Sequence, residues 1–164
     1  GTINTLVNNA GINTIKRSLS NVEPEDWDRI VTINLTGAFN CFRVVLPGMQ
    51  ENKEGLVINV ASIAGLRAGK LSGAAYVASK HGMVALSHQI NVEESENGIR
   101  ATVICPGEVE TPILDRRQNP VSAEHRARIL QPEDVAAAAV FVADLPKRAN
   151  VPELIITPST QAYA

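Results

Sequence analysis

Short apolar runs alternate along this chain with long segments of helical periodicity, and this alternation constrains the fold more than any other feature. The apolar runs lie around Leu6-Val7, at 55–62, at 99–105 and at 152–158. Segments with apolar residues at helical spacing cover about residues 25–50, 75–95 and 131–145. Strands that alternate with helices are typical of a parallel α/β sheet. We therefore expect one α/β domain with a parallel sheet between two layers of helices.

Small and polar residues follow the predicted strands. Asn8-Asn9-Ala10-Gly11 come after the first strand, Ser62 ends the second, and Pro106-Gly107 stop the third. Ligands of parallel α/β sheets bind at the carboxyl ends of the strands. The pattern therefore predicts a ligand site there, although a strand-end cap explains Ser62 and a strand terminator explains Pro106-Gly107 equally simply.

Tyr76 and Lys80, in the segment YVASK, are spaced for acid–base chemistry. A spacing of four places both side chains on one helix face. Lowering a tyrosine pKa from about 10 to about 7 requires roughly 4 kcal/mol of preferential stabilisation of the phenolate. One ammonium about 4 Å away supplies roughly that amount at an effective dielectric constant near 20. The pair is thus a candidate proton donor and acceptor while the lysine stays charged; taken alone, the pattern more often marks an exposed helical pair.

Composition and charge argue against several functional classes. The chain has 164 residues, of which 45% are apolar and 20% are charged, and this is enough for one domain with a core. A net charge of −2 gives no electrostatic reason to expect nucleic acid or an anionic membrane as a partner. We see neither a signal-peptide pattern nor a segment that approaches a membrane span, and we expect a cytoplasmic protein.

Cysteines and histidines give no indication of a metal site. Cys41 and Cys105 both lie in apolar surroundings, which favours two buried free thiols. His81, His88 and His125 lack ligand spacing with either cysteine. We therefore expect neither a metal nor a disulfide framework.

Five motifs in a fixed order resemble the short-chain dehydrogenase/reductase family. They are NNAG at 8–11, INLTG around Asn34, INVASIAG around Ser62, YVASK at 76–80 and PGEVET at 106–111. The resemblance runs from residue 1 to the last predicted strand and covers the second half of a Rossmann-type domain. It implies an oxidoreductase that uses NAD(P) to interconvert an alcohol and a carbonyl of a small-molecule substrate by hydride transfer.

The resemblance also implies catalytic roles for four residues. Tyr76 would exchange a proton with the substrate oxygen, and Ser62 would hold and polarise that same oxygen. Lys80 would lower the tyrosine pKa and hydrogen-bond the nicotinamide ribose. Asn34 would bind, through its main chain, a water that extends a proton relay from Lys80.

Cofactor contacts implied by the resemblance fall at two strand ends. The first group would pack beside the adenine ribose and stabilise the central strand: Asn8, Asn9, Ala10 and Gly11. The second group would line the nicotinamide end and approach the pyrophosphate: Pro106, Gly107, Val109 and Thr111. Tyr76 and Lys80 would contact the cofactor as well.

Substrate choice is expected to lie in the loops 63–74 and 108–131. Four arginines give the second loop a basic character: Arg116, Arg117, Arg126 and Arg128. One of them could meet a substrate carboxylate, although solvated surface arginines are the commoner case. The tail PSTQAYA is similar to the ending of the 3-hydroxy acid and serine dehydrogenase branch, which indicates a small hydroxy acid as substrate and favours NADP.

The phosphate-binding half of the family's domain has no counterpart in these residues. No Gly-x-x-x-Gly-x-Gly pattern occurs, and the strand ending at Asn8 is expected to form a bare sheet edge. We expect residues 1–164 to be a partial domain that is inactive by itself. The alternative is a non-catalytic fragment that keeps only a scaffold and an association surface. The helices at 25–50 and 75–95 correspond to those that build dimers and tetramers in the family, so we expect a homodimer or homotetramer.

Overall fold

The structure is a computed structural model that describes residues 1–161, and its centre is a sheet of four parallel strands. The strands are β1 (Thr5–Asn8), β2 (Gly55–Val60), β3 (Ile99–Pro106) and β4 (Glu153–Ile156). Their order in the sheet is β1-β2-β3-β4, so each strand pairs with the next one along the chain. The predicted parallel α/β class is confirmed.

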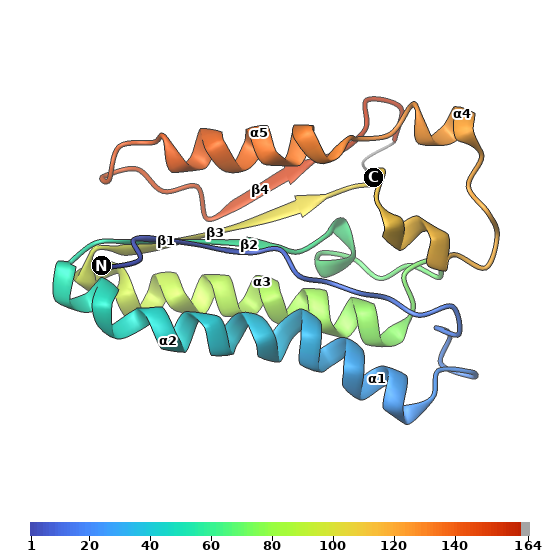
Figure 1. Ribbon diagram of the computed structural model, residues 1–164, viewed down its shortest axis with the longest axis horizontal. Coiled ribbons are helices and arrows are strands. Elements are labelled where there is room, and N and C mark those ends of the chain that lie inside the picture. Colours follow the sequence, from blue (N-terminus) through green and yellow to red (C-terminus); the bar gives the residue numbers. More distant parts are fainter. Residues whose placement is uncertain (162–164) are drawn as a thin grey trace.

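Helices cover both faces of the sheet (Figure 1). One face carries α1 (Pro24–Val31), α2 (Gly37–Asn52) and α3 (Ala74–Glu94). The other face carries α5 (Pro132–Ala143), which begins with a capping box formed by Gln131 and Asp134. The one-turn helix α4 (Ala123–Arg126) lies in the segment that links β3 to α5.

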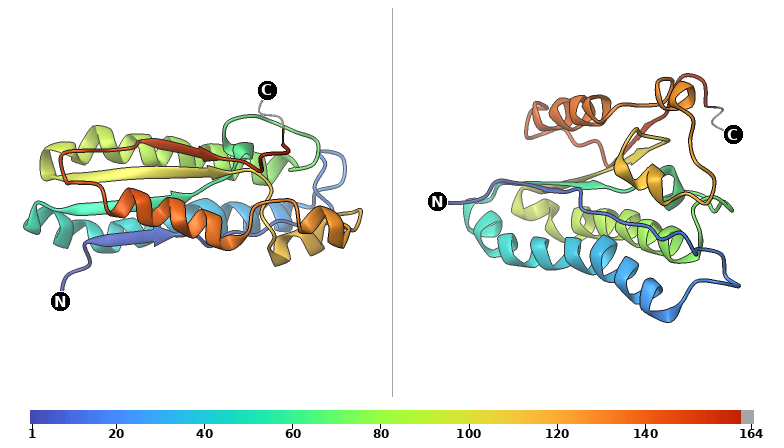
Figure 2. Two further views of the ribbon diagram at one scale, coloured as in Figure 1. Left: turned by 90° about the horizontal axis from the view of Figure 1, so that it is seen from above. Right: turned by 45° about the vertical axis from the view of Figure 1, so that its right-hand side comes forward.

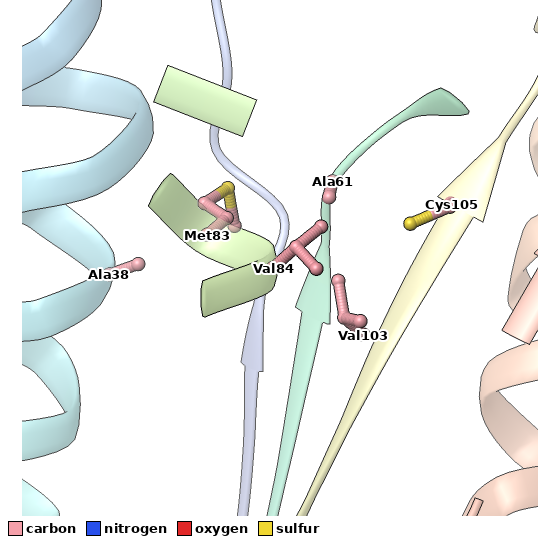
Figure 3. Close-up of a cluster of buried hydrophobic side chains, with 6 residues drawn as sticks. All are labelled: Ala38, Ala61, Met83, Val84, Val103 and Cys105. Carbon is pink, nitrogen blue, oxygen red and sulfur yellow. The ribbon is translucent and has the colours of Figure 1, made fainter. Parts of the chain in front are cut away.

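The core forms on both faces because neighbouring side chains of β2 point in opposite directions. Leu56 and Ile58 pack with Val142 of α5. Val57 faces the other way and packs with residues of α2 and α3. Figure 3 shows a further cluster on this second face, where side chains of α2 and α3 meet the ends of β2 and β3: Ala38, Ala61, Met83, Val84, Val103 and Cys105.

The helical segment predicted at 25–50 is interrupted. A π-helical turn, Thr32–Thr36, separates α1 from α2, and α2 continues past Pro47 to Asn52. Local periodicity does not signal a π turn, because the hydrophobic face is almost continuous through it. In the loop 108–131 the structure has a 3-10 helix, Pro112–Arg116, in addition to α4.

The prediction that both thiols are buried is correct for Cys105 and wrong for Cys41, which is exposed. Cys41 precedes the buried Phe42 by one residue, which is about 100° around the helix axis. Its apolar neighbours in sequence therefore belong partly to the outer side of α2. Burial raises the pKa of the Cys105 thiol to about 11.

The expectation that no segment approaches a membrane span also needs correction. The continuous helical stretch Pro24–Asn52 is long and apolar enough to cross a membrane, judged by length and composition alone. In the structure Ile30, Ala38, Phe42 and Met49 of this stretch are buried. Such a stretch is also what a core helix of an α/β domain provides.

β1 forms one edge of the sheet among the described residues. Within β1 the side chain of Asn8 is buried, whereas that of Val7, which points to the opposite face, is half exposed. Ile3, just before the strand, is also exposed. The edge and one face of β1 are therefore open to solvent.

Candidate active site

Three connecting segments gather at the carboxyl ends of the strands. Figures 1 and 2 show the segments after β1, after β2 and after β3 lying at the end of the sheet to which the arrows point. They enclose a cleft of about 910 Å³, a volume in the range of small-molecule sites. Most of the residues predicted for the site line it: Asn9, Gly11, Ser62, Tyr76, Lys80, Pro106, Gly107, Val109 and Thr111.

Tyr76 is the third residue of α3, and its side chain forms a hydrogen bond with that of Ser62, which follows β2. Burial raises the pKa of Tyr76 above its ordinary value, while the side-chain hydrogen bond with Ser62 and the positive charge of Arg17 lower it. Ser62 also caps the short 3-10 helix Ile63–Gly65, because its Oγ accepts a hydrogen bond from the Ala64 amide at 3.1 Å. The expected lowering of the Tyr76 pKa by Lys80 is not the effect that this structure shows.

Lys80 follows Tyr76 by one helical turn and is 3% exposed. Its Nζ lies 5.6 Å from the centroid of the Tyr76 ring and donates a hydrogen bond to the Val60 carbonyl at 2.9 Å. Burial lowers the pKa of Lys80 to about 8. Because this value is still above 7, the ammonium form predominates at neutral pH. The same burial makes that charge costly to the folded state.

Asn34 is fully buried in the π turn and does not line the cleft. Its Oδ1 accepts a hydrogen bond from the Ile12 amide at 2.8 Å. Its Nδ2 donates to the Ile12 carbonyl at 3.0 Å and to the Ser79 Oγ at 3.1 Å. Asn34 therefore ties the segment after β1 to α3 immediately beside Lys80. π turns within α-helices frequently occur at functional sites.

A chain of buried polar groups runs behind the cleft. Asn8 Nδ2 donates to Asn59 Oδ1 at 2.8 Å, and Asn59 Nδ2 donates to Ser87 Oγ at 2.8 Å. Ser87 Oγ in turn donates to the Met83 carbonyl at 2.8 Å. Asn8 thus joins β1 to β2 and α3 and does not face the cleft, and Ala10 does not line it either.

Two glycines allow close approach at the cleft. A Cβ added to Gly11 would lie 3.3 Å from Lys80 Nζ. A Cβ added to Gly107 would collide with the Gln161 side chain and lie 2.9 Å from Pro158. Gln161 Oε1 also accepts a hydrogen bond from the Glu108 amide at 3.3 Å. The described part of the tail therefore packs over the turn that follows β3.

Val109 and Thr111 lie at the start of the long loop 108–131. Val109 forms a parallel bridge with Leu130, flanked by the Glu110 amide to Leu130 carbonyl bond at 2.8 Å. Thr111 precedes the 3-10 helix Pro112–Arg116. The segment between 108 and 131 is thus closed into a compact flap at the cleft.

Two of the four loop arginines considered as partners for a substrate carboxylate form ion pairs within the chain. Arg117 contacts Glu108 at 3.4 Å, and Arg126 contacts both Glu110 at 2.9 Å and Asp115 at 2.6 Å. Arg116 and Arg128 are exposed. The buried arginine of the cleft is Arg17, in the segment after β1, which sequence reasoning missed. A lone arginine in a polar loop carries no periodic or motif signal that distinguishes it from a surface residue.

Within residues 1–161, no group of three or more His, Cys, Asp or Glu side chains could hold a metal ion. The polar groups that line the cleft include the Tyr76 phenol, the Lys80 ammonium, the Ser62 hydroxyl, the Glu108 carboxylate and the guanidinium groups of Arg17 and Arg117.

The fold and the cleft together define a parallel α/β domain of the dinucleotide-binding class, with a Tyr–Lys–Ser arrangement at the carboxyl ends of its strands. The chain belongs to the short-chain dehydrogenase family, because the family model described as short chain dehydrogenase matches residues 1–121. The resemblance seen in the sequence motifs is thereby confirmed.

Three similar proteins illustrate the relationship. D-beta-hydroxybutyrate dehydrogenase of Cupriavidus necator is 38% identical over 159 residues, which cover 87% of this chain and 61% of that protein. Inactive 2-(S)-hydroxypropyl-CoM dehydrogenase 2 of Xanthobacter autotrophicus is 39% identical over 87% of this chain and 66% of that protein. The closed form of a serine dehydrogenase complexed with NADP+ is similar in structure with a TM-score of 0.88 and 31% identity, covering 99% of this chain and 68% of that chain. The chain thus spans less than two thirds of the length of these two sequence relatives.

Proposed function

We propose that the protein containing this chain is an NAD(P)-dependent oxidoreductase that interconverts an alcohol and a carbonyl. The observation that carries this proposal is the convergence of Tyr76, Ser62 and the buried Lys80 on one cleft. Burying an ammonium costs stability, groups with pKa values shifted by burial cluster at functional sites, and an ammonium beside a phenol suits proton transfer.

Proton handling falls to Tyr76 in this proposal. In the reductive direction the phenol donates its proton to the substrate carbonyl oxygen, and in the oxidative direction the phenolate accepts the hydroxyl proton. Ser62 donates a hydrogen bond to the same oxygen and stabilises the charge that develops on it. Lys80 places a positive charge near the ring, with its Nζ 5.6 Å from the ring centroid.

The cleft residues fit a dinucleotide. Gly11 has no side chain beside Lys80, and at Gly107 the space of a side chain is taken by Gln161 and Pro158. With Asn9, Pro106, Val109 and Thr111 the two glycines would hold the cofactor along the strand ends, while Asn8 supports that wall from behind through its hydrogen bond to Asn59. A bound nicotinamide supplies or accepts the hydride. The serine dehydrogenase complexed with NADP+ supports NADP as the cofactor.

A small hydroxy acid is the proposed substrate. The names of two relatives, a hydroxybutyrate dehydrogenase and a serine dehydrogenase, support this class. The tail resemblance supports it too, through Pro158, Thr160 and Gln161, of which Gln161 lines the cleft; Tyr163 lies outside the described residues. The flap between 108 and 131 would close over such a substrate.

The test is Tyr76→Phe in the full-length protein, assayed with NAD and NADP against a panel of alcohols, hydroxy acids and their ketones. We expect turnover to fall by at least about 100-fold, because general acid–base catalysis contributes about that much or more. Cofactor binding, measured by fluorescence of the reduced dinucleotide, should stay within a few-fold. Full turnover in the variant would exclude Tyr76 as the acid–base group.

A second candidate function is a scaffold that associates without turnover. It is favoured by the exposed apolar side chains on the outer faces of α2 and α3, among them Phe39, Val44 and Val92. The same surface supports a homodimer or homotetramer of the enzyme, in the cytoplasm. Absence of turnover with either cofactor, together with a stable oligomer in sedimentation, would favour the scaffold.

A further inference from the structure

Arg17 is a buried cation to which the described residues offer no anion. Only 9% of the residue is exposed. Its Nη1 donates to the Leu71 carbonyl at 3.1 Å, and its Nη2 donates to the Arg116 carbonyl. Its Nε is buried and lacks a hydrogen-bond partner. Two of the five guanidinium N–H groups therefore meet neutral acceptors, and none meets a carboxylate within residues 1–161.

The charges around Arg17 add to this imbalance. Burial lowers the pKa of Arg17, and the positive charge of Arg117 lowers it further, while the charged form of the Tyr76 phenol would raise it. Arg117 is paired with Glu108 at 3.4 Å, so that carboxylate is already engaged. None of the ion pairs found in the described part of the chain includes Arg17. Buried charges are ordinarily paired, since an unpaired one is costly.

Arg17 is held in a fixed place relative to the proposed acid–base group. Its carbonyl accepts a hydrogen bond from the Ala74 amide at 3.1 Å, two residues before Tyr76 on α3. Gly73, with φ +79°, leaves room for the Arg17 side chain, because a Cβ there would lie 2.5 Å from Arg17 Cβ. Arg17 and Tyr76 line the same cleft. The guanidinium is therefore held by the Leu71 and Arg116 carbonyls in the cleft that Tyr76 also lines.

We propose that Arg17 binds the carboxylate of the substrate and makes the protein selective for hydroxy acids and keto acids over neutral alcohols and ketones. This inference rests on the proposed function, since it places the acid group beside the hydroxyl that Tyr76 serves. A guanidinium suits a carboxylate because its planar N–H groups donate two parallel hydrogen bonds. One N–H on each terminal nitrogen is left for this purpose among the described contacts.

The experiment compares acids with their own methyl esters. Short 3-hydroxy acids with four to six carbons and the matching esters share a skeleton and a hydroxyl and differ in charge. For each acid that the full-length protein turns over, we expect kcat/KM to exceed that of its methyl ester by at least about 100-fold. The ester lacks the negative charge that would pair with Arg17, and leaving a buried charge without its partner is costly. Arg17→Met should reduce this ratio to within about threefold while retaining turnover of the ester.

Two further variants separate recognition from support of the loops. Arg116→Met removes a neighbouring exposed arginine side chain and keeps the carbonyl that Arg17 contacts, so the acid-to-ester ratio should not change. Arg17→Lys keeps the charge without the planar fork and should lower the ratio only partly, by about tenfold. An equal loss for acid and ester in Arg17→Met, with an unchanged ratio, would show a purely structural role and overturn the proposal.

Failure of the proposed function has a different signature. If no alcohol or ketone is turned over, calorimetric titration of the same acids and esters into the wild-type protein still tests Arg17. Acids that bind at least about tenfold tighter than esters, with the difference lost in Arg17→Met, would support the anion site. Equal binding of acid and ester, or equal turnover of both by the wild type, would overturn it.

Discussion

Gly11 leaves space at the cleft that a side chain there would share with the Lys80 ammonium. A Cβ added to Gly11 would lie 3.3 Å from the Lys80 Nζ and 3.7 Å from Asn34 Oδ1. Lys80 cannot easily move aside, because its Nζ donates to the Val60 carbonyl at 2.9 Å and contacts Met83 Sδ at 3.6 Å. The absence of a side chain at Gly11 is therefore part of what places the ammonium beside Tyr76.

Gly11→Ala should impair turnover without unfolding the protein. The backbone of Gly11 does not adopt a positive φ, so alanine is tolerated there, and the strain falls on Lys80. We expect kcat to drop by about tenfold or more, since a misplacement of about 1 Å in an active site costs on the order of 100-fold. Steady-state kinetics and thermal unfolding by circular dichroism measure the two effects.

Gly48→Ala is the matched control for this change. Gly48 lies inside α2, and a Cβ there has nothing within 4 Å. Alanine should stabilise the helix by about 0.5–1 kcal/mol and leave turnover unchanged. Equal turnover in the two variants would show that Gly11 does not constrain Lys80.

Lys80→Met should stabilise the folded chain while it abolishes turnover. Lowering the lysine pKa from 10.5 to about 8 corresponds to about 3 kcal/mol of cost to the charged folded state. Below about pH 8 both states hold the proton and the cost is fully present. Between about 8 and 10.5 the unfolded chain binds more protons than the folded one, so wild-type stability rises with pH. Methionine removes this contribution and costs the hydrogen bond to Val60.

Urea unfolding of both proteins at pH 7.5 and pH 10 measures this effect. The stability advantage of Lys80→Met should be largest at the lower pH and should shrink by about 2 kcal/mol or more at the higher pH. Other lysines titrate in both proteins and cancel in the difference. A difference between the proteins that is independent of pH would show that Lys80 is not strained by burial.

The larger part of this fold follows from local patterns, since apolar runs predict the strands and apolar residues at helical spacing, together with capping residues, predict the long helices. The apolar run of β2 predicts a strand that is covered on both faces, and Leu56 and Val57 are indeed buried on opposite faces. Gly98, with φ +71°, ends the helical turn after α3, at a left-handed position where glycine is the usual residue.

Features that depend on distant partners were not predictable in the same way. The π turn carries Asn34, whose side chain bonds to Ile12 and Ser79, so the irregularity goes with contacts from two other segments. The burial of Arg17 depends on the carbonyls of Leu71 and Arg116, far along the chain. The roles of Tyr76, Lys80 and Ser62 stay predictions, and the structure places these three residues at one cleft.

Asn34→Ala should destabilise the chain substantially. The change leaves the partly buried Ile12 amide and carbonyl without their hydrogen-bond partners, while the Ser79 hydroxyl keeps its hydrogen bond to the Tyr76 carbonyl. Unsatisfied buried polar groups cost about 1–3 kcal/mol each, so we expect a loss of roughly 2–4 kcal/mol. Urea unfolding measures it, with the exposed Asn119→Ala as control. A loss below about 0.5 kcal/mol would show that Asn34 does not hold the segment after β1.

Ser62→Ala should shift the pH profile of alcohol oxidation. Oxidation needs the Tyr76 phenolate to accept a proton, so the rate rises with pH through the pKa of Tyr76. Burial raises that pKa, and the hydrogen bond from Ser62 lowers it. Removing the hydroxyl therefore raises the pKa, and the rising limb of kcat/KM should move to higher pH.

Reduction of a ketone gives the opposite test, because it needs the protonated phenol. For Ser62→Ala the pH at which reduction begins to fall should move upward, in parallel with the oxidation limb. The exposed Ser20→Ala serves as control and should leave both limbs in place. If both limbs stay fixed in Ser62→Ala while the rate falls at every pH, Ser62 acts on the substrate oxygen alone and does not set the proton affinity of Tyr76. A parallel upward shift would show that one hydroxyl at the end of β2 tunes the acid–base group on α3.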